Sequence, residues 1–128
     1  MKIHQEVTIP GAPAAVYDIL TSSKKFAQMT GGRAAEIGKE AGAAFSMFGG
    51  DIAGRNVEMV PGKRVVQAWR AGGWPEGVYS LVTFQLSAEG KGTKVVFDQV
   101  GHPEGADEML ASGWQQMYWS PMTTMLGG

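Results

Sequence analysis

The chain has 128 residues, of which 44% are apolar and 18% charged, a composition typical of a folded globular protein rather than a disordered one. Eleven basic and twelve acidic residues leave a net charge of −1, which argues against a nucleic-acid-binding surface because such a surface needs clustered positive charge. No stretch approaches the ~20 apolar residues of a membrane span, and the N-terminus, interrupted by Glu6 and two prolines, does not have the pattern of a signal peptide.

The absence of cysteine excludes disulfides, thiol chemistry and cysteine-ligated zinc. We therefore expect one cytoplasmic domain spanning residues 1–128, with no metal and no cofactor. Nineteen glycines are about twice the average usage of ~7%, which suits a small sheet with many tight turns. Eight methionines suit an irregular core or an adaptable binding surface equally well.

The start of the chain predicts one strand followed by two short helices. Pro13 favours the first turn of a helix, where its missing N–H does no harm, and Ala14–Leu20 continues that helix. Ser22–Met29 predicts a second short helix. The segment Ile3–Ile9 alternates in polarity, which predicts a strand with one buried face. The residues on that face are Ile3, Gln5, Val7 and Ile9.

The middle of the chain predicts short strands separated by turns, among them the turns Pro61-Gly62 and Gly90–Gly92. Consecutive strands joined by short turns indicate an antiparallel meander. The predicted strands are Ala35–Ile37, Ala43–Phe48, Ile52–Val60, Lys63–Arg70, Val78–Leu86 and Thr93–Val100. In the last three, the inward residues are Val65, Gln67, Trp69, Ser80, Val82, Phe84, Leu86, Thr93, Val95, Phe97 and Gln99.

The segment Glu104–Leu126 predicts the one long helix, which would span roughly 34 Å at a rise of ~1.5 Å per residue. This helix needs an apolar surface, and the sheet needs a cover for its own apolar face, so the two are expected to pack together in an α+β fold. A twisted sheet wrapped around a straight helix often leaves a hollow. At 100° per residue the apolar helix face holds Ala106, Leu110, Gly113, Trp114, Met117, Pro121 and Thr124, with Tyr118 and Met125 beside it.

Three positions in this helix each allow a structural and a functional interpretation. Gly113 destabilises a helix by about 1 kcal/mol relative to alanine, so it indicates either a closely approaching strand or room for a ligand. Pro121 removes a backbone donor and predicts a bend near Met117–Pro121, which either follows the sheet or shapes the mouth of a cavity. Trp119 is expected to point away from the main face, as is Leu126, and either packs on the short helices or contacts a partner.

Aromatic residues gather around the loop of residues 71–77. Trp69, Arg70, Trp74 and Tyr79 form an aromatic cluster around this loop, in which Arg70 stacked on Trp74 would be a cation–π pair. The cluster is either structural packing or the rim of a site for an apolar or aromatic ligand.

Two polar residues, Ser80 and Gln99, fall on the inward faces of their strands. Buried polar groups need hydrogen-bond partners. We expect these two to bond each other, Tyr118 or water, or else to orient a ligand.

No pattern typical of catalysis or metal binding is present. His4 and His102 are far apart, and neither has a carboxylate at the spacing of a metal site. Ser112-Gly113 lacks the flanking glycines of a nucleophile elbow, and the Gly-Gly pairs lack the Lys and Ser/Thr of a phosphate-binding loop. We assign no catalytic residue.

The run GRNVEMVPGKRVVQAWRAGGWPEGVYSLVTFQL (Gly54–Leu86), the run GTKVVF (Gly92–Phe97) and the motifs Gly113-Trp114 and Tyr118–Pro121 resemble the activator-of-heat-shock-protein-90-ATPase-like family of the SRPBCC superfamily. The opening Ile9–Gly32 fits the same pattern, so the resemblance covers nearly the whole chain. It implies the START-like, helix-grip fold: a curved antiparallel sheet of about seven strands around a long C-terminal helix, with two short helices after the first strand.

The same resemblance implies less about activity. START-like domains often hold an apolar ligand between sheet and helix, and a minority are cyclases. The eponymous activators stimulate a chaperone ATPase but have a second domain for which 128 residues leave no room. Gln99 stands where many relatives carry a histidine, which disfavours acid–base chemistry there.

Taken together, the sequence predicts non-catalytic binding of a small, mainly apolar or aromatic molecule by a monomer or weak homodimer. One alternative is a co-chaperone-like module that contacts a protein partner through Arg70, Trp74 and Trp119. The other is a cyclase-type enzyme, which needs an acid–base pair inside the cavity. The predicted ligand-binding residues are Trp69, Ser80, Phe84, Phe97, Gln99, Trp114, Met117 and Tyr118.

Overall fold

The computed structural model describes residues 2–127 and contains a seven-stranded antiparallel sheet with the order β1-β7-β6-β5-β4-β3-β2. The strands are β1 (Lys2–Ile9), β2 (Glu36–Ile37), β3 (Ala44–Met47), β4 (Ile52–Val60), β5 (Arg64–Ala71), β6 (Ser80–Glu89) and β7 (Gly92–Val100). The helical segments are α1 (Pro13–Thr21), α2 (Ser23–Met29), the 3-10 turn η1 (Phe48–Gly50), α3 (Asp107–Trp114), the π-helical turn η2 (Gln115–Trp119) and α4 (Ser120–Gly127).

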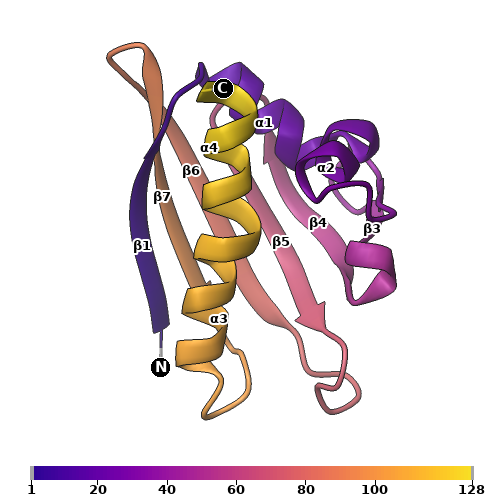
Figure 1. Cartoon of the computed structure of the whole chain (residues 1–128). Coiled ribbons are helices and arrows are strands. Elements are labelled where there is room, and N and C mark those ends of the chain that lie inside the picture. The colour runs from indigo at the N-terminus through magenta and orange to yellow at the C-terminus, as the bar shows by residue number, and fades with distance from the viewer. Residues whose placement is uncertain (1, 128) are drawn as a thin grey trace.

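The terminal helical run from α3 to α4 lies across one face of the sheet, and α1 and α2 lie on the same side (Figure 1), with α1 in contact with β6 and β7. This is the helix-grip arrangement, so the predicted fold class is confirmed. The first strand pairs with the last, because Ile3 of β1 lies opposite Gln99 of β7. That pairing places the N-terminal strand beside the helix that ends the chain.

The period-2 pattern of the strands predicts their faces correctly. Val65, Val82, Val95, Phe84 and Phe97 have no exposed surface, and all lie on the face under the helix. Alternate residues of an antiparallel strand point to opposite faces, so the residues between them line the outer face. This inner face is the core of the protein.

The short helices also follow the prediction. Pro13 occupies the first turn of α1, and the Ser22 side chain accepts a 3.3 Å hydrogen bond from the Lys25 backbone N–H at the start of α2. A serine in this position satisfies one of the free donors at a helix N-terminus. Phe26 of α2 is buried against Phe48 and Tyr118, which joins α2 to the terminal helix.

The terminal helix differs from the prediction in its register. It begins at Asp107 rather than Glu104, and its central turn is π-helical, with the Ser120 N–H donating to the Gln115 carbonyl five residues earlier. Pro121 lies two residues after this turn and has no N–H for the Met117 carbonyl. A π turn takes up one extra residue, so every later side chain is displaced around the axis relative to an α-helical wheel.

This displacement explains which residues the helix buries. The predicted inward positions Met117 and Thr124 are exposed, and the inward residues after the turn lie one position further on. Trp119, predicted to face outward, is 2% exposed, so that expectation is wrong. The side chains that face the core in this part of the helix are Tyr118, Trp119 and Met122.

Candidate functional site

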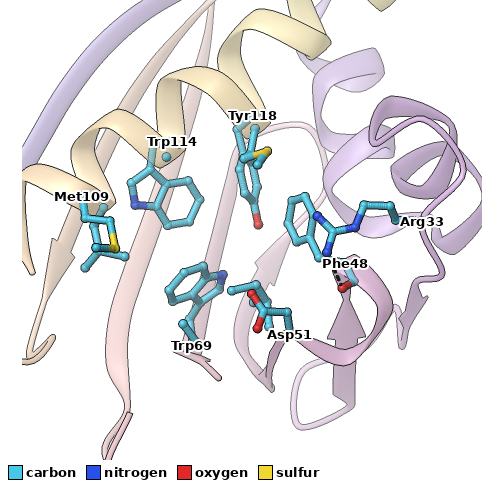
Figure 2. A pocket seen from close by; sticks show the side chains of 12 residues that line it. Arg33, Phe48, Asp51, Trp69, Met109, Trp114 and Tyr118 are labelled. Carbon is cyan, nitrogen blue, oxygen red and sulfur yellow. Dashed lines mark hydrogen bonds between the residues drawn. The ribbon is translucent and has the colours of Figure 1, made fainter. Parts of the chain in front are cut away.

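A cavity of about 160 Å³ lies between the terminal helix, strands β4 and β5, and η1. Figure 2 shows the side chains that surround it, with Tyr118 and Trp114 descending from the helix and Trp69 rising from β5. The aromatic rings form one continuous wall, since the ring centroids of Trp69 and Trp114 are 5.0 Å apart and those of Trp114 and Tyr118 are 4.4 Å apart. The wall is therefore mainly apolar.

Gly113 opens the cavity on the helix side. It lines the space, and a Cβ atom built on it would meet no atom within 4 Å. The interpretation that a strand approaches this glycine closely is therefore wrong. The structure has unfilled space beside Gly113, as the other interpretation predicted. A larger residue here would project into the cavity.

Two buried donors in the cavity wall lack partners among the described residues. They are the indole Nε1 of Trp69 and the hydroxyl of Tyr118, on side chains that are 4% and 3% exposed. Burial raises the pKa of the Tyr118 hydroxyl, and the neighbouring Trp69 N–H opposes that shift only in part, without the geometry of a formed hydrogen bond. Tyr118 therefore keeps its proton and can donate. The great majority of buried polar side-chain atoms have a partner, so this pair stands out.

The mouth of the cavity carries one positive and one negative side chain. Arg33 and Asp51 are both exposed and both line the rim. The Arg33 guanidinium lies 5.1 Å from the centre of the Phe48 ring and donates a 3.0 Å hydrogen bond to the Phe48 carbonyl. Phe48 has a positive φ of 55°, a left-handed conformation that is uncommon for a bulky residue. Sequence reasoning misses this rim, because only folding brings the two segments together.

Four of the eight predicted ligand-binding residues lie at the cavity wall. These are Trp69, Trp114, Met117 and Tyr118. Met117 is half-exposed, so it forms part of the opening rather than the interior. Their role in binding stays a prediction.

The other four predicted ligand-binding residues lie in the packed core, away from this cavity. Phe84 and Phe97 have no exposed surface and are in contact, with ring centroids 5.1 Å apart. Ser80 and Gln99 satisfy each other, because the Gln99 side-chain NH₂ donates to the Ser80 Oγ over 3.0 Å. The expected bond between these two is confirmed, and it leaves neither free for a molecule in the cavity.

The predicted partner surface is only partly present. The cation–π partner of Arg70 is Tyr79 rather than Trp74, with the Arg70 Cζ 5.6 Å from the centre of the Tyr79 ring. The guanidinium also donates 3.0 Å hydrogen bonds to the carbonyls of Trp74, Pro75 and Val78. Arg70 thus holds the loop of residues 71–77 in shape. Trp74 packs edge-on against Trp69, with ring centroids 5.8 Å apart.

Trp119 cannot belong to an outer surface in this fold. Its ring stacks near that of Trp114, with centroids 6.2 Å apart, and its indole N–H donates a 2.7 Å hydrogen bond to the Gln5 side chain of β1. It packs in the central aromatic core, which neither interpretation from the sequence foresaw.

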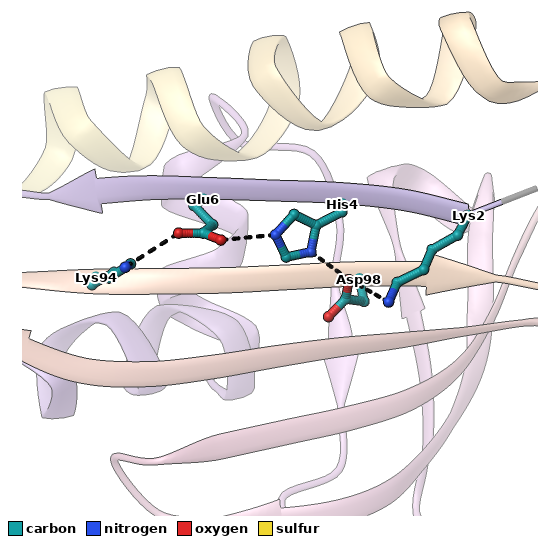
Figure 3. Close-up of polar contacts among 5 residues, drawn as sticks. All are labelled: Lys2, His4, Glu6, Lys94 and Asp98. Carbon is teal, nitrogen blue, oxygen red and sulfur yellow. Dashed lines mark hydrogen bonds and ion pairs between the residues drawn. The ribbon is translucent and has the colours of Figure 1, made fainter.

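Both histidines have carboxylate hydrogen-bond partners in the fold, which the sequence analysis did not foresee. His102 Nε2 lies 2.6 Å from Asp107 Oδ1 at the start of α3. On the outer face of the sheet, His4 lies between Asp98 and Glu6 (Figure 3), at 2.7 Å and 2.9 Å from their carboxylate oxygens. His4 of β1 contacts Asp98 because β1 and β7 are neighbouring strands. Neither histidine lines the cavity.

Within residues 2–127, no three His, Asp or Glu side chains cluster in a way that could hold a metal ion. In the same part of the chain, no helix has the length and hydropathy to cross a membrane.

Comparison with known proteins identifies the family of this chain and a solved structure with the same fold. The chain matches the family described as "Activator of Hsp90 ATPase homolog 1-like protein" over residues 11–127. A solved structure of an HSP90 activator from Plasmodium falciparum superposes with a TM-score of 0.92 at 24% identity, over 99% of this chain and 96% of that one. At this identity the superposition supports the fold alone.

Sequence relatives support the same family. The activator of 90 kDa heat shock protein ATPase homolog from Dictyostelium discoideum is 35% identical over 106 residues, which are 82% of this chain and 27% of that protein. The homolog 1 from Homo sapiens is 26% identical over 126 residues, or 98% of this chain and 37% of that protein. The chain belongs to the Activator of Hsp90 ATPase homolog 1-like family, and it spans about a third of the length of these relatives.

Proposed function

We propose that this protein binds a small, mainly apolar molecule in the cavity between the terminal helix and β5, without chemical turnover. The observation that carries the proposal is the open space at Gly113, surrounded by aromatic rings and by two buried donors that have no partner within residues 2–127. Pockets for small molecules are mainly apolar with a few convergent polar groups. This cavity has that composition.

The size of the cavity limits what can bind. Its volume of about 160 Å³ is below the roughly 300–1,000 Å³ of pockets for drug-sized ligands. An engineered apolar cavity of about 150 Å³ accommodates benzene. The proposal is therefore restricted to molecules of about one ring, unless the exposed Met117 at the opening moves aside.

Thermal shift with a library of single-ring compounds, followed by native mass spectrometry of the purified protein, tests this function. Gly113→Leu should abolish binding because the new side chain fills the cavity. Ser112→Leu adds the same side chain at the exposed neighbouring position and should bind like the native protein. A native protein that binds no compound, or a Gly113→Leu variant that binds as well as the native one, would sink the proposal.

A second candidate is a co-chaperone-like module acting on a chaperone ATPase, favoured by the 35% identity to a relative named as such an activator. The exposed Tyr79 and the loop held by Arg70 would form the contact, without Trp119. The test is ATP turnover by a purified 90 kDa heat-shock protein with and without this chain. Tyr79→Ala should weaken any stimulation, and absence of both binding and stimulation argues against this function.

The cyclase-type alternative gains no support from the described residues. The buried polar groups at the cavity are an indole N–H and a phenol, which do not make an acid–base pair at neutral pH. A cytoplasmic location and a monomeric or weakly dimeric state remain parts of the proposal.

A further inference from the structure

We propose that the molecule bound in this cavity is a neutral single-ring aromatic compound carrying a carbonyl-type oxygen, which accepts hydrogen bonds from Trp69 Nε1–H and the Tyr118 hydroxyl. The inference rests on the proposed function and adds the chemical class of the ligand. It follows from the number, type and burial of the free donors, the charges at the rim and the shape of the walls.

The two buried donors indicate which polar group the ligand carries. An indole N–H can only donate, so the group that satisfies Trp69 must be an acceptor. Tyr118 can also donate, since burial raises the pKa of its hydroxyl and keeps it protonated. A carbonyl oxygen has two lone pairs and can accept from both side chains at once.

The other indoles of the core show that this freedom is specific to the cavity. Trp114 Nε1 donates to Gln99 over 2.8 Å, and Trp119 Nε1 donates to Gln5 over 2.7 Å. Each of these N–H groups has an internal glutamine acceptor, whereas Trp69 Nε1 has none among residues 2–127. The fold therefore pairs buried indoles where the core is closed and leaves one unpaired where the cavity lies.

The walls and rim of the cavity indicate that the ligand is aromatic and uncharged. The rings of Trp69, Trp114 and Tyr118 favour an aromatic partner, because aromatic rings pack well in offset and edge-to-face contacts. An anionic oxygen would be buried against neutral donors only, with the Asp51 carboxylate at the rim, which is unfavourable for a charge removed from water. The positive charge of the Arg33 guanidinium at the exposed rim is offset by the Asp51 carboxylate at the same rim. The ligand is therefore neutral.

Three probes separate the contributions of shape, acceptor and charge. Acetophenone has the ring and the carbonyl oxygen, α-methylstyrene has the same shape with a methylene in place of that oxygen, and benzoate has the oxygen with a negative charge. Affinities for the native protein are measured by titration followed by NMR. We expect acetophenone to bind about ten-fold more tightly than α-methylstyrene, as two neutral hydrogen bonds imply, and more tightly than benzoate.

The NMR signal of the Trp69 indole N–H reports the bond directly. It should move to lower field with acetophenone and not with α-methylstyrene, whereas the indole signals of Trp114 and Trp119 should change little. Trp69→Phe assigns the signal by its loss. Tyr118→Phe keeps the ring and removes the hydroxyl, so it should lower the preference for acetophenone over α-methylstyrene several-fold.

The outcomes distinguish this inference from the function on which it rests. If both neutral probes bind equally well, the cavity takes apolar molecules, the donors do not select an acceptor and the inference fails alone. If benzoate binds best, the assignment of a neutral ligand is wrong. If neither neutral probe binds and the Trp69 N–H is held by a trapped water, both the inference and the proposed function fail for molecules of this size.

Discussion

The indole Nε1–H of Trp114 donates a 2.8 Å hydrogen bond to the side-chain oxygen of Gln99 in the interior of the protein. Gln99 has no exposed surface, and its NH₂ group donates in turn to Ser80. The Ser80 hydroxyl then donates over 2.8 Å to the Trp69 carbonyl. This chain of bonds links the terminal helix to the three neighbouring strands β7, β6 and β5.

Gln99→Leu should lower the free energy of unfolding by about 2 kcal/mol, because it leaves the Trp114 N–H buried without an acceptor. Urea denaturation followed by tryptophan fluorescence measures the change. Gln85→Leu makes the same substitution at an exposed position of β6 and should be nearly neutral. Equal stabilities of the two variants would show that the Trp114 bond contributes nothing.

Gly113→Ala should raise the free energy of unfolding by roughly 0.5–1 kcal/mol. Alanine is the better helix former, and its Cβ meets no atom within 4 Å. Gly54→Ala should do the opposite and destabilise the protein by about 2 kcal/mol or more, since its Cβ would lie 1.8 Å from the Ala68 carbonyl oxygen. Thermal unfolding of both variants checks the signs. A destabilised Gly113→Ala protein would mean that the space at Gly113 is filled.

Trp119→Ala should cost about 3–5 kcal/mol of stability, as expected for a tryptophan removed from a core. Met117→Ala should cost less than about 1 kcal/mol, because this side chain is 47% exposed. The comparison tests the register that the π turn produces, since an uninterrupted α-helix would reverse the order. If Trp119→Ala does not fold, Trp119→Phe gives the answer, with a smaller loss of stability that should still exceed that of Met117→Ala.

The His4 cluster predicts a defined pH dependence. The hydrogen bond to Asp98, and next the bond to Glu6, raise the pKa of His4, so its stabilising effect is present at acid pH and disappears as pH rises through that raised pKa. His4, and next Lys94, lower the pKa of Glu6, whose effect is present above the ordinary glutamate pKa and disappears as pH falls through the lowered one. The cluster therefore stabilises most in mildly acid solution.

NMR titration of the His4 ring protons measures this shift. Asp98→Asn should return the His4 pKa towards its ordinary value of about 6.5, and Glu6→Gln should change it less. His4→Gln assigns the signals against those of His102. An unchanged His4 titration in Asp98→Asn would contradict the contact drawn in Figure 3.

The fold follows from local patterns, and the site does not. A period of two along Val65–Trp69 and along Val95–Gln99 predicts the inner faces of β5 and β7 correctly, because the side-chain period of a strand is two whatever it pairs with. Val66, on the opposite face of β5, is buried as well, which this period does not predict. The mutual bond of Ser80 and Gln99 is predictable for the same reason, since adjacent strands with known faces bring two inward polar groups together.

The terminal helix shows where such patterns fail. In an α-helix, Trp114 and Trp119 would be about 140° apart around the axis, so the sequence predicts that only one of them is inward. The π turn at Gln115–Trp119 brings both rings to the core. Pro121 signals an irregularity there, but its loss of a donor fits a bend as well as a π turn.

The order of the elements, the inward faces of the strands and the family resemblance are predictable from the sequence, because each depends on residues close together along the chain. The fold alone shows that His4 contacts Asp98, that Arg33 and Asp51 share a rim, and that the Trp69 and Tyr118 donors in the cavity wall have no partner within residues 2–127. These features depend on how closely the sheet packs against a helix with one displaced turn. The spacing of apolar residues along the chain contains no information about that packing.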